Sequence, residues 1–226
     1  MPNWVTNELT STAKGLDAIA KLMGANGIDA MSEDDGIMFD FNKIIPMPES
    51  LNIEEGSVSS AAVSYAKGEV PSGFKDMEDL ESRFENWDKT KEEMIALGEQ
   101  ILENERLYGC RSWYSWSNMN WGTKWNASET RAFNEFIGFE TAWSSPYPVI
   151  QKLSELIPDE EITVEYADED TSHNCGRYTF LNGEEIDSYQ PESGSKEAYE
   201  LAFKISGGDD YYEFSEETGT YEYIED

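Results

Sequence analysis

The side chains with the greatest potential for catalysis or metal binding are few in this sequence. The only histidine, His173, lies two positions before Cys175 in the segment TSHNCG, and Cys110 is the only other cysteine. A structural zinc site would need further ligands from elsewhere, and a Cys–His nucleophile would need an orienting partner and an oxyanion site. Glycine-rich phosphate loops and the HExxH metal motif are both absent from the sequence. The sequence therefore predicts no catalytic residue, no metal and no cofactor, and it favours a binding protein over an enzyme.

Carboxylates are the abundant chemical groups of the chain. Its 226 residues hold 47 Asp and Glu against 16 Lys and Arg, which gives a net charge of −31. This imbalance argues against direct binding of nucleic acid, whose affinity comes largely from cations at phosphates. It also disfavours adsorption to an anionic membrane surface. Solubility of a small domain needs a net charge of only about 2–8, so the excess indicates a surface that attracts a basic partner.

The acids concentrate in the C-terminal third of the chain. Residues 154–226 hold 22 acids and three bases, and residues 209–226 hold eight acids, five aromatic rings and no base. The tail is therefore the first candidate for a partner-binding surface, with carboxylates to pair with cations and rings to anchor the contact. Its candidate residues are Glu213, Glu216, Glu217, Glu222, Glu225 and Asp226, with Tyr211, Tyr212 and Phe214 as anchors.

A second set of acids steps by three or four residues along a predicted helix. These residues are Glu78, Glu81, Glu85 and Asp88. On a continuous helix they would lie roughly 6 Å apart, a spacing that resembles the phosphates of a nucleic-acid strand. Nearby lysines and arginines partly neutralise them, so an ordinary solvated helix face is the competing interpretation.

An aromatic run, WYSWSNMNWGTKW, follows this helix. Its rings could fill the core between sheet and helices, where large aromatic side chains dominate burial. They could instead line a sheet face that binds a small anionic ligand through stacking and two nearby cations. The residues of this alternative ligand site are Arg111, Trp113, Trp116, Trp121, Lys124 and Trp125.

The periodicity of the remaining chain predicts an α+β scaffold. Apolar residues alternate in strands, recur at helical spacing in helices, and flank Asn182-Gly183, a signal for a tight hairpin. The expected strands are 3–10, 37–45, 135–143, 162–168 and the hairpin 177–189, and the expected helices are 13–24, 58–67, 76–106, 147–157 and 196–204. This order predicts a ferredoxin-like antiparallel sheet with helices on one face. We expect that domain over 1–190, with a helical insertion at about 51–110 and an acidic extension over 191–226.

Four segments together resemble the YubB-type ferredoxin-like family of phage and plasmid proteins. They are MPNWVTNEL, FDFNKIIPMPESL, YGCRSWYSWSNMNWGTKWNA and FETAWSSPYPVIQKLSEL, and the likeness spans most of residues 1–185. It implies a ferredoxin-like fold and a mobile-element origin, and it carries over no functional residues.

Charge and resemblance together predict a mobile-element protein that imitates nucleic acid. Its partner would be a basic nucleic-acid-binding host protein such as a defence nuclease, and the alternative is a small-anion binder that uses the Trp-rich sheet face. The sequence lacks a signal-peptide pattern and any run of 18 apolar residues, so we expect it to act in the host cytoplasm.

Overall fold

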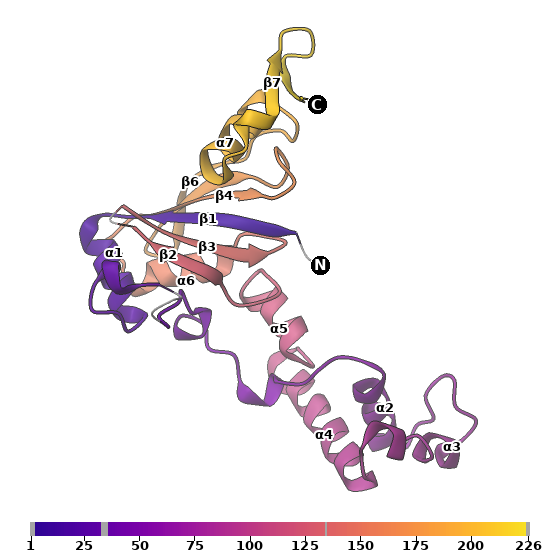
Figure 1. Ribbon diagram of the computed structural model, residues 1–226. Helices are drawn as coiled ribbons and strands as arrows, with labels where there is room; N and C mark the ends of the chain where they lie inside the picture. The colour runs from indigo at the N-terminus through magenta and orange to yellow at the C-terminus, as the bar shows by residue number, and fades with distance from the viewer. Residues whose placement is uncertain (1–2, 33–35, 134, 225–226) are drawn as a thin grey trace. The chain divides into compact units, whose positions relative to one another are not determined.

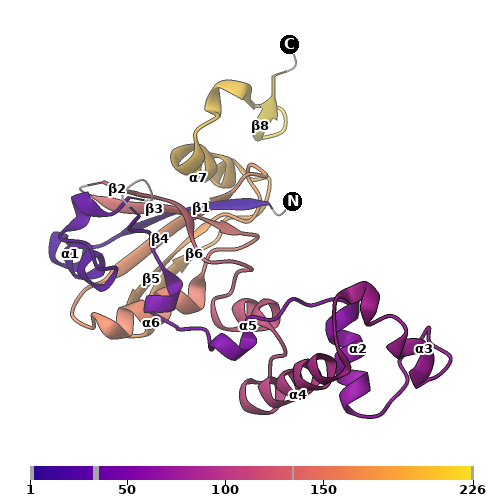
Figure 2. The ribbon, with the colours of Figure 1, turned by 60° about the horizontal axis from the view of Figure 1, so that its bottom comes forward.

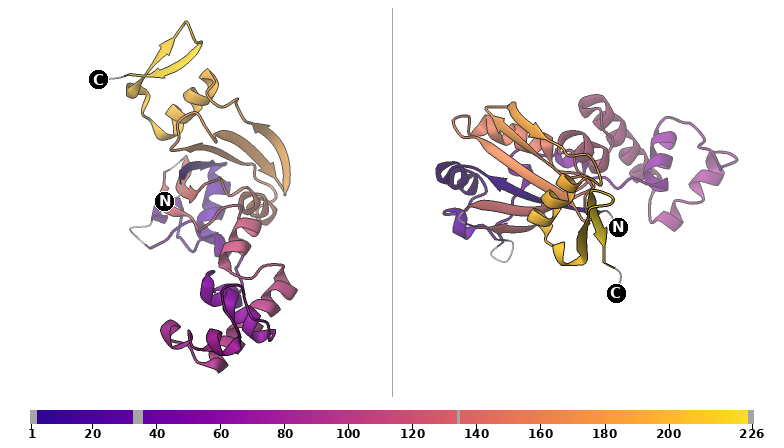
Figure 3. Two further views of the ribbon diagram at one scale, coloured as in Figure 1. Left: turned by 90° about the vertical axis from the view of Figure 1, so that its right-hand side faces the viewer. Right: turned by 90° about the horizontal axis from the view of Figure 1, so that it is seen from above.

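The structure is a computed structural model that describes residues 3–32, 36–133 and 135–224. The chain forms two compact units. Residues 1–46 and 120–226 form the first, here called the sheet unit, and residues 47–119 form the second, here called the insertion unit. Figure 1 shows both units, coloured from the N-terminus to the C-terminus, and Figure 3 shows them from two further sides. The insertion that the sequence predicts at about 51–110 lies inside the second unit.

The sheet unit is built on six antiparallel strands in the order β2-β3-β1-β4-β5-β6. These are β1 (Trp4–Thr10), β2 (Ser128–Ala132), β3 (Phe136–Ala142), β4 (Ile162–Asp168), β5 (Gly176–Leu181) and β6 (Glu184–Tyr189). Helices α1 (Ala13–Leu22) and α6 (Tyr147–Leu156) follow β1 and β3. The succession β1-α1-β2-β3-α6-β4, with β1 between β3 and β4, is the ferredoxin-like arrangement, and β5 and β6 extend it by a hairpin. The predicted α+β, ferredoxin-like fold is confirmed.

One face of the sheet packs on α1 and α6 to form the core. Alternate residues of β1 point toward these helices, so Val5, Asn7 and Leu9 are buried whereas their neighbours are half-buried. Helix α1 begins where the side chain of Thr12 accepts a hydrogen bond from the backbone of Gly15 at 3.1 Å, a standard N-cap. The strands lie between α6 on one side and α7 (Lys196–Ser206) on the other (Figures 1 and 2).

Helix α7 covers part of the second face of the sheet. Its Ala198 and Ala202 pack against Ala167 and Cys175, and all four are buried. The η5 turn (Asp209–Tyr211) then leads into a two-stranded hairpin, β7 (Tyr212–Ser215) and β8 (Thr220–Tyr223). The predicted acidic extension is therefore folded through residue 224, as a helix and a hairpin.

The strand predicted at 37–45 is wrong. Ile37 forms one isolated bridge to Ser32, and the segment continues into a short 3-10 helix, η2 (Phe41–Lys43). Its backbone donors bond to side chains instead of to a strand: the N–H of Phe39 donates to Thr130 Oγ1 at 3.0 Å. The second strand of the fold is instead β2, so the insertion lies between α1 and β2. Another turn of 3-10 helix, η1 (Ile28–Ala30), precedes this segment.

The insertion unit is helical. Its elements are η3 (Glu49–Leu51), α2 (Ser57–Ala66), α3 (Met77–Glu81), η4 (Glu85–Trp87), α4 (Lys91–Tyr108) and the greater part of α5 (Trp113–Asn120). Helices α2 and α4 cross at Gly98, where an added Cβ would lie 2.1 Å from the carbonyl oxygen of Ala62. This close approach brings Met94, Leu80 and Phe84 into one buried cluster with the alanines of α2.

The single helix predicted over 76–106 is also wrong. The chain turns at Asp88, which has a left-handed φ of 52°, and α4 starts afresh at a capping box. There the side chain of Thr90 accepts from the N–H of Glu93 at 3.2 Å, and Glu93 accepts from the N–H of Thr90 at 2.8 Å. The signal Thr-x-x-Glu that marks such a start is present in the sequence.

Candidate partner-binding surface

The C-terminal hairpin presents carboxylates on one face. Glu213 of β7 pairs directly with Glu222 of β8, and both side chains are exposed. Side chains of such a pair lie about 4.5–5.5 Å apart at Cβ. Thr218 Oγ1 donates to Glu222 at 2.9 Å, and neither glutamate forms an ion pair with a described residue. Glu216 and Glu217 follow in the exposed turn between the strands. We call Glu213, Glu216, Glu217 and Glu222 the hairpin acids.

The other face of the hairpin is aromatic and packs on α7. Tyr212 lies with its ring centroid 5.3 Å from that of Tyr199 and 5.4 Å from that of Phe203, and Tyr221 lies 5.1 Å from Phe203. Phe214, which is 43% exposed, contacts Tyr221 at 5.5 Å. Alternation along the strands thus directs rings inward and acids outward.

The predicted aromatic anchors differ in their availability. Tyr212 is held in the cluster on α7, so its main role is to fix the hairpin in place. Phe214 lies partly in the same cluster, with Lys196 Nζ 5.2 Å from its ring centroid. Tyr211, in the η5 turn, is 62% exposed and is free to contact a partner. The remaining predicted tail residues, Glu225 and Asp226, lie outside the described residues.

The acids of the insertion do not share one helical face. Glu78 and Glu81 lie on the short α3, Glu85 begins η4, and Asp88 occupies the left-handed turn. Glu81 is already engaged, because it pairs with Lys91 at 2.5 Å and accepts from the hydroxyl of Tyr65 at 2.6 Å. These two hydrogen bonds lower the pKa of Glu81. The regular spacing that suggested a row of phosphates is therefore not formed.

The Trp-rich run is not part of the sheet, which corrects the alternative prediction. Trp113 and Trp116 lie on helix α5 in the insertion unit, whereas Trp121 and Trp125 lie in the sheet unit. Trp116 and Trp121 are both 5% exposed. Trp121 donates its indole N–H to the carbonyl of Ile45 at 3.0 Å, so this ring is part of the core.

The two cations of that alternative are engaged in different units. Arg111, in the insertion unit, forms a two-nitrogen contact with Glu105, with Nη2 2.9 Å and Nε 3.1 Å from Oε1. Lys124, in the sheet unit, lies over the rings of Trp125 and Trp143 at 4.3 and 4.9 Å. Because Arg111 and Lys124 lie in different units, neither unit contains an anion site formed by both cations.

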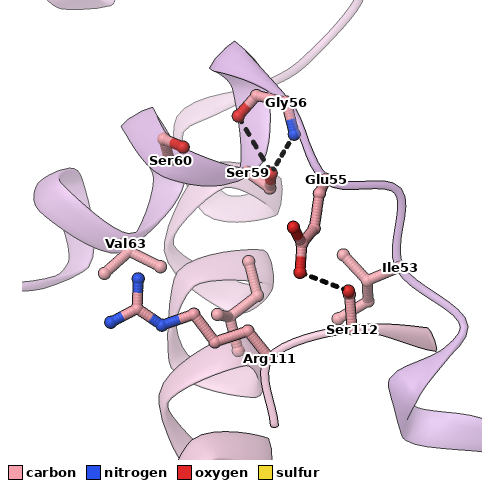
Figure 4. Close-up of a pocket in the computed structure, with 9 residues that line it drawn as sticks. Ile53, Glu55, Gly56, Ser59, Ser60, Val63, Arg111 and Ser112 are labelled. Carbon is pink, nitrogen blue, oxygen red and sulfur yellow. Dashed lines mark hydrogen bonds between the residues drawn. The ribbon is translucent and has the colours of Figure 1, made fainter. Parts of the chain in front are cut away.

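The insertion unit has a hollow of about 200 Å³ beside Arg111 (Figure 4). Its polar wall is already satisfied: Ser112 donates to Glu55 at 2.5 Å, and Ser59 caps α2 by accepting from Gly56 N–H at 2.8 Å. Figure 4 shows the guanidinium of Arg111 directed toward Val63. With a carboxylate in its wall and its arginine paired, this hollow does not favour an anion.

A second hollow, of about 220 Å³, lies on the sheet face that α7 leaves open. Gly138 of β3 contributes to its lining without a side chain, and Glu8, Glu140 and Phe133 contribute theirs. Sequence reasoning missed these residues, because isolated acids carry no signal in so acidic a chain. The glycine within the strand EFIGFETAW was the one available sign, since glycine in a strand often marks a close approach to the backbone.

The histidine and cysteines are separated in the structure. His173 is exposed, with its Nδ1 3.9 Å from Oδ1 of Asp170, whereas Cys175 is buried against α7. Burial raises the pKa of the Cys175 thiol and of the Cys110 thiol, which lowers their reactivity. Among the described residues, no three His, Cys, Asp or Glu side chains are grouped so that they could hold a metal ion.

The fold places the chain among α+β proteins with a ferredoxin-like sheet. Residues 120–222, which run from β2 to β8, match the family model described as a ferredoxin-like domain in Api92-like protein. The crystal structure of a protein api92 from Yersinia pseudotuberculosis also matches, with 12% identity and a TM-score of 0.39 over 86% of this chain and 99% of that chain. A TM-score below 0.5 does not establish a shared arrangement, so the fold assignment rests on the sheet and the family model.

No curated protein matches the chain. The descriptions of the matching family model and of the matching crystal structure name no enzymatic activity. The ferredoxin-like part of the predicted resemblance is confirmed, whereas the matches name Api92-like proteins, and the YubB-type assignment stays a prediction. In the part of the chain that is described, no helix has both the length and the apolar character to cross a membrane.

Proposed function

We propose that this chain is an acidic binding protein that imitates the charge of nucleic acid. It would come from a phage or plasmid, as the YubB-type resemblance implies, and act in the host cytoplasm. Its partner would be a basic nucleic-acid-binding host protein, such as a defence nuclease. The hairpin acids would pair with lysines and arginines that otherwise meet phosphates, so that the protein competes with nucleic acid for one groove.

The observation that carries the proposal is the direct pairing of Glu213 with Glu222 on a folded hairpin. Like charges opposite each other destabilise a strand pair, and neither glutamate forms an ion pair with a described lysine or arginine. The hairpin nevertheless folds, because its aromatic face packs on α7 and because Thr220 Oγ1 donates to the carbonyl of Gly194 at 2.7 Å. An arrangement that opposes its own folding is expected where the exposed charge has another use.

General solubility is the competing explanation of the charge. It predicts acids spread over the surface and balanced locally, as on α4, where Arg106 pairs with Glu103 at 2.5 Å. The C-terminal segment departs from this pattern, since no lysine or arginine follows Lys204. Its rings also fix the acids on a rigid support, which lowers the entropy lost on binding.

The test is a pull-down of partners from host lysate over a range of salt concentrations. One variant carries glutamine at the four hairpin acids. A matched variant carries glutamine at four exposed glutamates of the insertion unit that make no ion pair with a described residue, Glu54, Glu69, Glu92 and Glu99. Both variants lose the same charge, so only the position of the charge differs.

We expect the native chain to retain one basic nucleic-acid-binding protein near physiological salt, and double-stranded DNA to displace it. The hairpin variant should bind it about tenfold or more weakly, and the matched variant should bind it as the native chain does. Equal losses in the two variants, or retention of many basic proteins that modest salt removes, would refute the proposal.

A further inference from the structure

The hollow on the open sheet face combines a glycine floor with an aromatic wall. Gly138 stands directly opposite Glu8 in the β1–β3 pairing. The rings of Phe133 and Phe136 stack beside it with centroids 4.6 Å apart, and Phe133 is 49% exposed. Ile205 of α7 also lines the hollow. An apolar ring surface is thus kept in contact with water next to a place where the sheet has no side chain.

The charged groups of the hollow leave an excess of negative charge. Arg131 pairs with Glu129 at 3.2 Å, so these two offset each other. Glu8 and Glu140 also line it, and the carboxyl group of neither makes a hydrogen bond or an ion pair with a described residue. They lie on the same face, because Glu140 stands two residues from Gly138 on β3, a diagonal spacing of about 7–8 Å.

The surroundings of these two carboxyl groups disfavour their charged form. Burial raises the pKa of Glu8, and the neighbouring Glu165 raises it further, whereas Lys204 acts against the shift. Burial also raises the pKa of Glu140, as does Glu129, and Arg131 opposes this. A cation bound in the hollow would favour the charged form of both carboxyl groups.

We propose that this hollow binds the side chain of an arginine that belongs to a protein partner. The inference rests on the proposed function, because it names a residue of the basic partner and the place where that residue is held. The guanidinium would stack on Phe133 and donate hydrogen bonds to Glu8 and Glu140, which flank the floor formed by Gly138.

Size and chemistry favour an arginine over other cations. The hollow is smaller than the roughly 300–1,000 Å³ of pockets that enclose drug-sized ligands, so it suits one side chain. A planar guanidinium both stacks on aromatic rings and donates in several directions, whereas a lysine ammonium is a compact and strongly hydrated point charge. The carboxylates of Glu8 and Glu140 lie diagonally across Gly138, so each can accept from a different nitrogen of one guanidinium.

The experiment is an NMR titration of the full-length ¹⁵N-labelled protein with N-acetyl-L-arginine amide. N-acetyl-L-lysine amide and sodium chloride at equal ionic strength serve as the comparison ligands. We expect saturable shifts at residues 6–8, 129–133 and 136–140, and a weaker response to the lysine derivative. Shifts spread over all acidic segments, or equal shifts with sodium chloride, would overturn the proposal.

The deciding variant is Gly138→Val, which fills the hollow and leaves the net charge unchanged. A Cβ at Gly138 has its nearest neighbour at 3.5 Å, an ordinary contact distance, and the backbone there is not left-handed. Binding of the arginine derivative should weaken about tenfold. Phe133→Ser, at a half-exposed ring outside the core, is the second variant if Gly138→Val does not fold. Unchanged binding in a folded variant would overturn the inference.

The result of the arginine titration can be distinguished from the result of the pull-down that tests the proposed function. The arginine shifts at the lining residues report on the hollow, and the hairpin acids lie outside that hollow. The variant with glutamine at the hairpin acids should therefore retain the arginine shifts. If the hollow fails while the hairpin variant still loses the partner, nucleic-acid mimicry stands without an arginine anchor.

Discussion

Replacing both Glu213 and Glu222 by glutamine should stabilise the hairpin while weakening its binding to a basic partner. The two carboxylates face each other across β7 and β8. If the charges are separated by about the Cβ spacing of such a pair, about 5 Å, their repulsion in water is about 0.8 kcal/mol. Screening over a Debye length of about 8 Å halves it to about 0.4 kcal/mol at physiological salt. In about 1 M salt, where the Debye length is about 3 Å, little repulsion remains.

Hydrogen exchange at the amide of Ile224 measures this effect locally. That amide donates to the carbonyl of Tyr211 at 2.9 Å at the open end of the hairpin. Its exchange should slow about twofold at physiological salt, because about 0.4 kcal/mol corresponds to that factor at room temperature. The slowing should grow at low salt and disappear at high salt.

The matched control is glutamine at Glu216 and Glu217. These residues lie in the turn and do not face each other across the strands, so the same charge is removed with a smaller gain in protection. If Ile224 exchanges at the native rate, or faster, in Glu213→Gln/Glu222→Gln at low salt, the cross-strand repulsion is absent. The pairing of Glu213 with Glu222 would then cost the hairpin nothing and would no longer indicate a binding role.

Three further predictions concern single side chains. Gly98→Ala should destabilise the insertion unit by about 1–3 kcal/mol in urea unfolding despite its better helix propensity, because its methyl would lie 2.1 Å from the carbonyl oxygen of Ala62; an unchanged midpoint would contradict this. Burial and the hydrogen bond to Glu185 raise the pKa of Tyr147 to about 12, so Tyr147→Phe should leave the tyrosine absorbance titration unchanged until the pH nears that value. Stability due to Tyr147 should accordingly fall as pH rises above 10 toward 12. The pKa of Glu8 is raised by burial, so the folded state retains that proton to higher pH than the unfolded chain does. Glu8→Gln should therefore raise the melting temperature at neutral pH but not below the ordinary glutamate pKa of about 4.3; an equal gain at both pH values would contradict it.

Much of the sheet unit follows from local sequence patterns. Alternation in β1, the helical spacing of α6 and the Asn182-Gly183 turn each predict their element, and each lies where expected. Asn182 and Gly183 adopt positive φ values of 50° and 80°, as the type I′ turn requires. These signals work because one buried face fixes the period of each segment.

The errors arise where side chains outside the segment decide its conformation. Phe39 and Phe41 alternate as in a strand, and both rings pack against Phe139, at 4.7 and 6.2 Å between centroids. Their backbone N–H groups nevertheless donate to the side chains of Thr130 and Asn126 and not to a neighbouring strand. The true second strand, SETRA, buries only Thr130 and gives almost no hydrophobic signal. Tertiary contacts thus override the local pattern in both segments.

The candidate surface was predictable in part. The charge of the C-terminal segment and its rings are visible in the sequence, but the sorting of acids and rings onto opposite faces depends on the register Glu213–Glu222. The hollow could not be predicted, because Glu8 and Glu140 meet only when β1 pairs with β3.

The position of β1 in the sheet has a consequence for synthesis on the ribosome. Thr10 pairs with Phe136 and Thr163, so the central strand is synthesised before both of its neighbours, which emerge only after the whole insertion has been made. At roughly 5–20 residues per second this delay is of the order of ten seconds. The helical insertion can meanwhile fold on its own local contacts, whereas the two exposed edges of β1 wait for partners. A chaperone that shields the nascent β1 strand should therefore raise the yield of folded protein.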